Sequence, residues 1–395
     1  MSMKALAGVR ILDLSRYVAG PFCCQILGDH GADVVKVEKP DGEPARTIPP
    51  FAQSESLYFF AYNGSKRGIT INFRSPEGLA LLKKLMARAD IVVENFRAGT
   101  MEKMGLGYDA MAAQNPRLIM VSISGFGTVG PYVGRPAFDE IIQGMSGLAS
   151  LTGTSEGPPT LTGTYVADFV TGLYGAIAAL LALQLRAQTG KGQWVRTNLL
   201  HSLISILNTT VSRYLLLGEA PQRQGNRNPN IAPGNVYRAK DGYVTIECLT
   251  QDMWEGLARA MGREDLVRDP RFPDVLSRHR NAQDLDREIE AWMAPRTVDE
   301  VMGILERHSI PSGPVLDIPS LVRDPQFLAN QTVVNVEYPG LGQVPLLAPP
   351  LRLSGEGSPR RGRPPRLGEH TAEVLSEWLD LNAEQIQRLG AAGAV

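Results

Sequence analysis

Residues 8–15 read GVRILDLS, residues 20–32 read GPFCCQILGDHGA and residues 33–39 read DVVKVEK. The first and third segments are short and mostly apolar, which is typical of buried strands. The middle segment is typical of a helix. A strand, a helix and a second strand in this order predict two parallel strands joined by a crossover helix.

The same alternation continues toward residue 125. Residues 68–73, GITINF, precede a helical segment whose Ser75, Pro76 and Glu77 form a strong helix start. Residues 91–96, IVVENF, and 118–125, LIMVSISG, follow as further strands. The predicted fold class is therefore α/β, with a doubly wound and mainly parallel sheet.

The pattern changes near Gly218, where a segment rich in Gly, Pro, Asn and Arg indicates a linker or a functional loop. Beyond it, NVYRAKDGYVTIECL predicts a β-hairpin that turns at Lys-Asp-Gly. A Pro-rich passage then leads to two closing helices. The predicted parts are 1–215, the first portion of a large domain; 216–330, a small α+β domain with linkers; and 331–395, a return segment whose helices dock on the large domain.

Composition restricts the class of protein. The 395 residues are 43% hydrophobic and 21% charged with a net charge of −1, which argues against a nucleic-acid partner. Three unevenly spaced cysteines and an N-terminus without an export signal predict a cytoplasmic location. Residues 165–185 are long enough to span a bilayer, but Asp168 and the glycines favour a buried helix, so no membrane association is expected.

Two short motifs and the five histidines are better explained without a cofactor-binding, catalytic or metal-binding role. The GxGxxG match at 125–130 is followed by Pro131 instead of a helix, so a Gly-rich loop is favoured and an NAD-dependent dehydrogenase ranks last. The GxSxG match at 153–157 is followed by two prolines, which argues against a serine hydrolase. None of the five histidines has metal-ligand spacing to another His or Cys, so no metal site is predicted.

Asp168 is the carboxylate that interrupts the apolar run GTYVADFVTG, residues 163–172. The polar segment before it breaks helix, so Asp168 is expected within the first turn of the long helix that follows. Free N–H groups at that end would favour the ionised carboxylate. Position alone leaves two interpretations open: an N-cap, or a nucleophile in a partly dry pocket.

A set of segments that occur in order along the chain helps to decide between these two interpretations of Asp168. The sequence resembles the class III CoA-transferases, the formyl-CoA transferase and carnitine CoA-transferase family, over nearly its whole length. The resemblance is carried by LAGVRILDLSRYVAGPFCCQILGDHGADVVKVEKPDG, NGSKRGITINFRSPEG, DIVVENFRAGTMEKMGLGYDAM, NPRLIMVSISGFG, FDEIIQGMSGL, TGKGQWV, SIPSGPV and LGEHTAEVL.

The resemblance implies a Rossmann-like large domain built from both chain ends, a small α+β domain between them, and an interlocked homodimer. It implies an acyl-CoA:carboxylate CoA-transferase in which Asp168 is the nucleophile, forming a mixed anhydride and then an aspartyl-CoA thioester. Coenzyme A and acyl-CoA would be substrates, and no permanently bound cofactor is expected.

The resemblance also places contacts with coenzyme A. These fall on Val18, Ala19, Lys39, Ile71, Asn72, Phe73, Arg74, Asn95, Phe96, Arg97, Lys103, Pro136, Ala137, Phe138 and Asp139. The candidate oxyanion loop is the segment NIAPGNVY around Gly234. This segment lacks the run of several glycines seen in formyl-CoA transferases, so oxalate and formate are not expected as substrates. Arg223 and Arg227 could meet a second carboxylate in a dicarboxylic acid such as succinate.

Two other functions are compatible with the same fold and stay open. The α-methylacyl-CoA racemases pair the matching aspartate with a histidine, because racemisation needs two bases. Phe138 stands where that histidine would be, which favours the transferase. A catalytically silent acyl-CoA binding protein, with Asp168 as a helix cap, is the third hypothesis. Arg196 and His201 depart from the family pattern and receive no assigned role.

Overall fold

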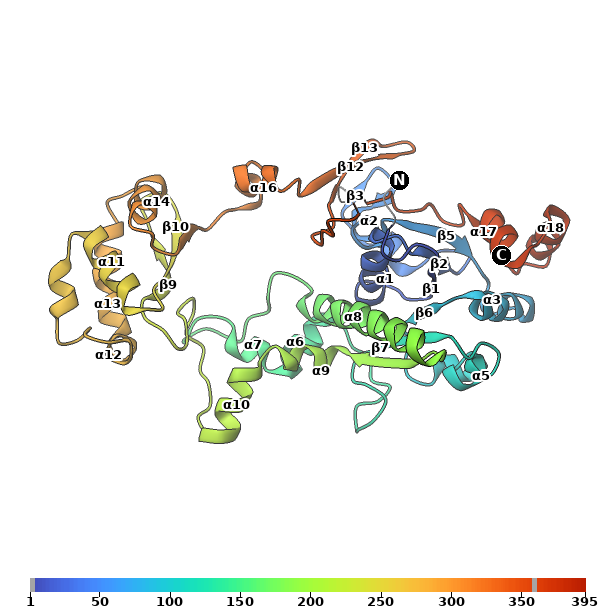
Figure 1. Cartoon of the computed structure of the whole chain (residues 1–395), viewed down its shortest axis with the longest axis horizontal. Helices are drawn as coiled ribbons and strands as arrows, with labels where there is room; N and C mark the ends of the chain where they lie inside the picture. Colours follow the sequence, from blue (N-terminus) through green and yellow to red (C-terminus); the bar gives the residue numbers. More distant parts are fainter. Residues whose placement is uncertain (1–3, 357–360) are drawn as a thin grey trace. The chain divides into compact units, whose positions relative to one another are not determined.

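The computed structural model describes residues 4–356 and 361–395, and the chain divides into two compact units (Figure 1). The first comprises Met1–Leu148, Leu161–Leu217 and Leu328–Val395, and the second comprises Ala149–Thr160 and Gly218–Phe327. Residues 149–160, which the sequence assigned to the large domain, thus group with the second unit. The predicted limits at 215 and 330 stay predictions for separately folding domains.

A six-stranded sheet forms the centre of the first unit, and all of its strand pairs are parallel. This confirms the predicted α/β class with a parallel sheet. The strand order is β5 (Lys66–Thr70), β2 (Asp33–Glu38), β1 (Arg10–Asp13), β6 (Ile91–Glu94), β7 (Ile119–Ser124) and β8 (Trp194–Asn198).

Helices cover both faces of this sheet, because successive strand residues point to opposite sides. In β1, Ile11 belongs to one buried cluster and Leu12 to the other. The Ile11 side carries α1 (Ala19–Asp29), α6 (Asp139–Ser146), α8 (Val166–Thr189) and α9 (Leu199–Ser205). The Leu12 side carries α3 (Pro76–Arg88), α4 (Thr100–Lys103), α5 (Tyr108–Ala112) and α17 (Thr371–Leu379).

The predicted start of α3 is confirmed, since the Ser75 hydroxyl accepts a hydrogen bond from the Gly78 N–H at 2.9 Å and Pro76 is the first helical residue. The smaller elements of the first unit are η1 (Pro44–Thr47), β3 (Phe51–Ala52), β4 (Glu55–Ser56), α2 (Leu57–Asn63), α10 (Asn208–Leu217), β12 (Val333–Tyr338), β13 (Gly342–Leu347) and α18 (Ala383–Ala391). Helix α7 (Leu148–Leu151) stands at the boundary between the two units.

The end of the chain packs on the sheet that its beginning builds. The Trp378 side chain is buried in the α3 cluster and donates its indole N–H to Asp33 at 3.0 Å. The Arg10 guanidinium lies 5.3 Å from the centre of the Trp378 ring. The first unit is therefore assembled from segments at both ends of the sequence.

Helix α8 has one buried and one exposed face. Gly172 lets α8 approach α1 closely, because a Cβ atom there would lie 2.8 Å from the Ala19 carbonyl oxygen. On the opposite side Ile177 and Leu181 are 50% and 64% exposed. Among the described residues, α8 is the one helix long and apolar enough to cross a membrane. The prediction of a buried helix holds for only one of its faces.

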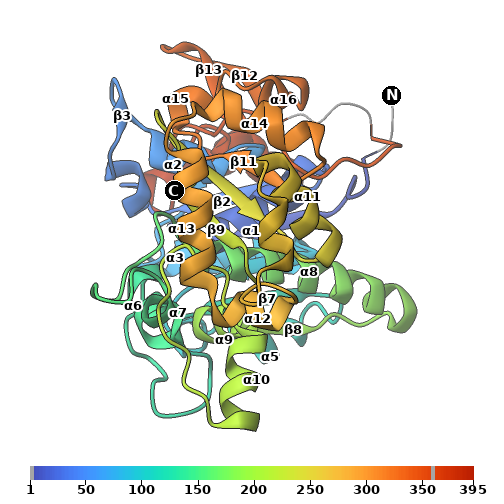
Figure 2. The same ribbon diagram turned by 90° about the vertical axis from the view of Figure 1, so that its left-hand side faces the viewer.

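The second unit is a small α+β fold (Figure 2). Its antiparallel sheet has the order β11 (Ser312–Pro314), β10 (Tyr243–Glu247) and β9 (Gly234–Arg238), so the predicted hairpin is confirmed. The helices are α11 (Gln251–Met261), η2 (Glu264–Arg268), α12 (Val275–Arg280), α13 (Ala282–Met293), α14 (Val298–Arg307) and α15 (Ile318–Leu321). Helix α16 (Pro325–Ala329) contains the point at which the chain passes back to the first unit.

Candidate active site

The sheet of the first unit changes its direction of growth between β1 and β6. From β1 the chain adds β2 and β5 on one side, and it later adds β6, β7 and β8 on the other. Ligands of open α/β sheets bind outside the carboxyl ends of the strands at such a switch point. A cavity of about 250 Å³ lies there, lined by the loops after β1, β6 and β7 and by the first turn of α8.

The loop after β7 contains the GxGxxG match, and it forms part of the cavity wall. Strand β7 ends at Ser124 and the next helix, α6, begins only at Asp139. No helix starts inside the glycine motif, so the arrangement that a dinucleotide fingerprint requires is missing. The sequence prediction of a Gly-rich loop is confirmed.

Asp168 is the one carboxylate among the described residues that line this cavity. It is the third residue of α8, which confirms its predicted place in the first helical turn. The next residue, Phe169, packs against Phe22 at 5.1 Å and against Tyr62 at 5.9 Å between ring centres. The Asp168 carboxylate is therefore half-buried beside a group of aromatic rings.

Asp139 occupies the helix end that Asp168 was expected to use. Its Oδ1 atom accepts hydrogen bonds from the backbone N–H groups of Ala167 at 2.6 Å and Asp168 at 3.0 Å. Gln143 donates a hydrogen bond to the other Asp139 oxygen. Within 4–356 and 361–395, no residue donates a hydrogen bond to the carboxylate of Asp168. Asp139 is buried in this role, so its predicted direct contact with coenzyme A does not fit the structure.

The pKa of Asp168 is raised to about 7, first by burial and then by the negative charges of Asp139 and Glu140. The sequence argument expected the helix end to keep this carboxylate ionised. That expectation is wrong because Asp139 takes the N–H groups that would have stabilised the anion. Asp168 is consequently an acid whose proton affinity lies close to neutral pH.

A reaction that needs ionised Asp168 should lose kcat/KM below pH 7, because the protonated carboxyl is not a nucleophile. Asp139→Asn removes one negative charge and keeps an oxygen that can cap α8. The pKa of Asp168 should fall toward its ordinary value, and the acid limb of the profile should move to lower pH. Profiles of kcat/KM from pH 5 to 9 for both proteins measure this. An unmoved limb would show that another group controls it.

Comparison with known proteins identifies the family of this chain. The sequence profile described as CoA-transferase family III matches residues 6–371, nearly the whole chain. The chain belongs to CoA-transferase family III. It is therefore an enzyme of the CoA-transferase class, whose substrates are CoA thioesters.

Individual relatives of this CoA-transferase extend over the same length. A protein of Chloroflexus aurantiacus named succinyl-CoA:D-citramalate CoA-transferase is 35% identical, with 98% of this chain and 97% of the relative covered. A succinyl-CoA:mesaconate CoA-transferase of Haloarcula hispanica is 38% identical, with 95% and 96% covered. The crystal structure of a CAIB/BAIF family protein from Brucella suis is 37% identical, has a TM-score of 0.84 and covers 95% of this chain and 99% of its own.

The cavity of this CoA-transferase contains no histidine. Phe138, which by the sequence resemblance stands at the position of the racemase histidine, lines the wall, and its ring lies 5.6 Å from that of Tyr17, edge to face. None of the five histidines is among the described lining residues. The described lining residues therefore offer no histidine as the second base that racemisation would need.

The residues predicted to contact coenzyme A fall into three groups. Those that line the cavity are Ala19, Asn95, Phe96, Arg97, Pro136, Ala137 and Phe138. The side chains of Val18 and Ile71 are buried in the core. Lys39 pairs with Asp41 at the surface, Asn72 donates a hydrogen bond to the Gly393 carbonyl, Phe73 packs on the α3 cluster, and Arg74 and Lys103 are exposed. Apart from the buried Asp139, these contacts stay predictions.

Arg223 and Arg227, which the sequence suggested for a substrate carboxylate, have structural partners in the second unit. Arg223 donates hydrogen bonds to the carbonyl oxygens of Ser150, Thr154 and Gly157. Arg227 forms an ion pair with Asp286 at 2.6 Å. These contacts use part of the donor capacity of each arginine, and a role for either at a substrate carboxylate stays a prediction.

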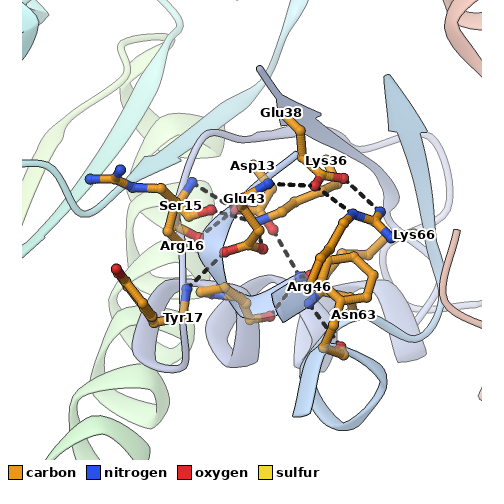
Figure 3. Close-up of polar contacts among 12 residues, drawn as sticks. Asp13, Ser15, Arg16, Tyr17, Lys36, Glu38, Glu43, Arg46, Asn63 and Lys66 are labelled. Carbon is orange, nitrogen blue, oxygen red and sulfur yellow. Dashed lines mark hydrogen bonds and ion pairs between the residues drawn. The ribbon is translucent and has the colours of Figure 1, made fainter. Parts of the chain in front are cut away.

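The sequence analysis missed a buried group of charges behind the cavity (Figure 3). Lys66 forms an ion pair with Asp13 at 2.8 Å, and both side chains are fully buried. Lys36 forms a second pair with Glu43 at 2.7 Å. A partial signal was available in the sequence, because Lys36 interrupts the apolar run VVKV of β2.

This group of charges fixes the loop that follows β1. The second oxygen of Glu43 accepts the backbone N–H of Tyr17 at 3.0 Å, and Lys36 donates a hydrogen bond to the Ser15 carbonyl. Tyr17 has a φ of 66°, a left-handed conformation that is rare for a residue with a side chain. The buried charges therefore hold a strained loop whose residues Arg16 and Tyr17 line the cavity.

A second cavity, of about 680 Å³, lies at the carboxyl ends of β6, β7 and β8. Burial raises the pKa of Glu94 in its wall to about 7. Arg196, unassigned by the sequence, also lines it and lies 4.7 Å from the centre of the Trp194 ring. His201 belongs to α9 and is exposed. The two cavities share Phe96 and Arg97 as wall residues.

Proposed function

We propose that this family III CoA-transferase moves coenzyme A from an acyl-CoA donor to a free dicarboxylic acid, with Asp168 as the nucleophile. The supporting observation is a half-buried carboxylate that receives no hydrogen bond from the described part of the chain, in a cavity at the switch point of the sheet. Two relatives are named for transfer from succinyl-CoA to citramalate and to mesaconate, which are dicarboxylic acids. A dicarboxylate acceptor is the simplest extension to this chain.

The proposed exchange proceeds through two kinds of acyl-enzyme. The Asp168 carboxylate attacks the thioester carbonyl, the C–S bond breaks, and a mixed anhydride and CoA thiolate form. The thiolate attacks the Asp168 carbonyl, which releases the donor acid and leaves an aspartyl-CoA thioester. The acceptor carboxylate then attacks this thioester, which releases CoA thiolate and forms a second mixed anhydride. The thiolate attacks the acceptor's carbonyl in this anhydride, which gives the new acyl-CoA and frees the Asp168 carboxylate. Each step stores the activation of the original thioester.

The surroundings of Asp168 suit such intermediates. Both the anhydride and the aspartyl thioester would be lost if water attacked them, so the reacting groups must be kept dry. Phe169, Tyr62 and Tyr58 form a chain of ring contacts at 5.9 Å and 5.4 Å between centres. These rings offer apolar surface on the side of α8 that carries the carboxylate.

Gly234 stays the proposed source of an oxyanion donor. It is the first residue of β9 in the second unit and follows a cis Ala232–Pro233 bond. Valine in its place keeps the backbone N–H, but the valine side chain would displace the start of β9. If this N–H stabilises the developing oxyanion, the substitution should lower kcat for transfer with little change in coenzyme A affinity. A parallel loss of folding stability would instead assign Gly234 to the packing of β9, where a Cβ would lie 2.8 Å from the Asn228 side chain.

An interlocked homodimer is also proposed. The exposed apolar residues of α8 include Leu173, Ile177, Leu180 and Leu181. An apolar surface of this kind is typical of a face that another subunit covers.

A transfer assay tests the proposed function. The protein is incubated with succinyl-CoA and, in turn, citramalate, mesaconate, malate and glutarate, and both the new acyl-CoA and free coenzyme A are quantified. The new acyl-CoA should form much faster than free coenzyme A accumulates. Hydrolysis without transfer, or exchange of the α-proton in a branched acyl-CoA, would refute it and support a hydrolase or a racemase. Binding of coenzyme A without turnover would support the silent binding protein.

A further inference from the structure

Arg16 has an unusual position in the wall of the Asp168 cavity. It follows β1, lines the cavity and is only half-buried as a residue, yet its Nε atom is buried and has no hydrogen-bond partner among the described residues. Its guanidinium lies 5.3 Å from the centre of the Phe96 ring, another wall residue. The guanidinium makes no ion pair with a carboxylate of the described residues, so an anionic group of a ligand in the cavity can supply one.

The backbone of Arg16 is fixed on both sides. Asn95 accepts the Arg16 N–H at 2.8 Å and donates to the Arg16 carbonyl at 2.7 Å. The following residue, Tyr17, is held by Glu43 of the buried charge group. Figure 3 shows the Arg16 side chain extending away from that group. The guanidinium is thus directed by a rigid loop and is not consumed by the nearby carboxylates.

The charges of the wall indicate the kind of ligand. Arg16, Arg97 and Arg135 face the cavity together with the single carboxylate of Asp168. Arg97 and Arg135 are exposed, which suits phosphates at the entrance, whereas Arg16 carries the buried nitrogen. The volume of about 250 Å³ is many times the roughly 10–15 Å³ that a single water molecule needs. The cavity therefore has room for a short acyl chain with an anionic end.

We propose that Arg16 binds the distal carboxylate of a dicarboxylic acyl group and so selects dicarboxylic over monocarboxylic substrates. This inference rests on the proposed function, because it names the residue that reads the substrate there. The planar guanidinium can donate from its two terminal nitrogens to the two oxygens of a carboxylate. A substrate that ends in a methyl group offers the guanidinium no acceptor and loses this interaction.

Succinyl-CoA and butyryl-CoA form a matched pair, since they differ in having a carboxylate or a methyl group at the far end. The rate at which each donor labels Asp168 is measured by peptide mass spectrometry with hydroxylamine as the trap. Arg16→Gln should reduce the ratio of succinyl to butyryl labelling by about 10- to 100-fold. Arg16→Lys should restore part of the ratio. Arg135→Gln, at an exposed arginine of the same wall, should change both rates by the same factor.

Equilibrium binding of coenzyme A to Arg16→Gln separates the two possible anions. Unchanged coenzyme A affinity with a reduced donor ratio supports the carboxylate assignment. Equal losses for both donors with weaker coenzyme A binding would show that Arg16 binds a phosphate, and an unchanged ratio would also overturn the proposal. If the wild-type protein is labelled by neither donor, the proposed function fails. Calorimetry with succinate and butyrate then tests Arg16 alone, with preferential succinate binding expected only in the wild-type protein.

Discussion

Asp168→Asn should abolish CoA transfer, with a loss of roughly 10⁴-fold or more in kcat. The amide cannot attack a thioester, so neither the mixed anhydride nor the aspartyl-CoA thioester can form. Asp168→Ala should behave in the same way and excludes recovery by deamidation. The measurement is transfer from succinyl-CoA to a dicarboxylic acid, together with mass spectrometry of the Asp168 peptide. Near-normal transfer in either folded variant would make Asp168 a residue of structure alone.

Folding stability provides the control for this loss of activity. The pKa of Asp168 is raised to about 7 in the folded protein, from an ordinary value near 3.8. Below pH 3.8 this carboxyl is protonated in both the folded and the unfolded protein. Between pH 3.8 and 7 it ionises in the unfolded chain but stays mostly protonated in the folded protein, so the free energy of unfolding falls as pH rises. An asparagine side chain does not ionise, so the variant does not lose folding stability in this way. Asp168→Asn should therefore be more stable than wild type at pH 8, by roughly 2–4 kcal/mol.

Asp13→Asn should produce the largest loss of stability. Lys66 is fully buried and pairs with Asp13 at 2.8 Å, so the variant leaves a buried ammonium without its counter-ion. Removing one member of such a pair costs about 3–5 kcal/mol. Urea unfolding at pH 7 and at one protein concentration measures the change. Asp41→Asn, which breaks the exposed pair with Lys39, is the control and should leave the midpoint almost unchanged.

The pH dependence of the wild type supplies a second measure of the same pair. Burial alone would raise the pKa of Asp13, but the charges of Lys36 and Lys66 lower it below its ordinary value. The stability that Asp13 contributes is therefore present above the unfolded value and lost as pH falls through the lowered one. In Asp13→Asn the free energy of unfolding should lack the decrease at low pH that protonation of Asp13 causes in the wild type. If the variant matched Asp41→Asn in both experiments, the buried pair would contribute little to the fold.

Much of the fold could be predicted because its signals are local. The alternation of strand and helix patterns, the Ser75 helix start and the Lys-Asp-Gly turn are each contained in a few residues. The family could also be recognised, since its segments occur in order along the chain. The exposed face of α8 could not be predicted, because an apolar sequence does not state which neighbours cover it.

The sequence by itself determined the parallel α/β fold, the CoA-transferase family and the place of Asp168 in the first turn of its helix. Only the tertiary structure decided what surrounds Asp168. Asp139 lies far from it in sequence but occupies its helix end, and Asn95, in the loop after β6, fixes the loop of Arg16. The physical reason is that proton affinity and charge pairing depend on distances across the fold, whereas strand and helix patterns depend on neighbours along the chain.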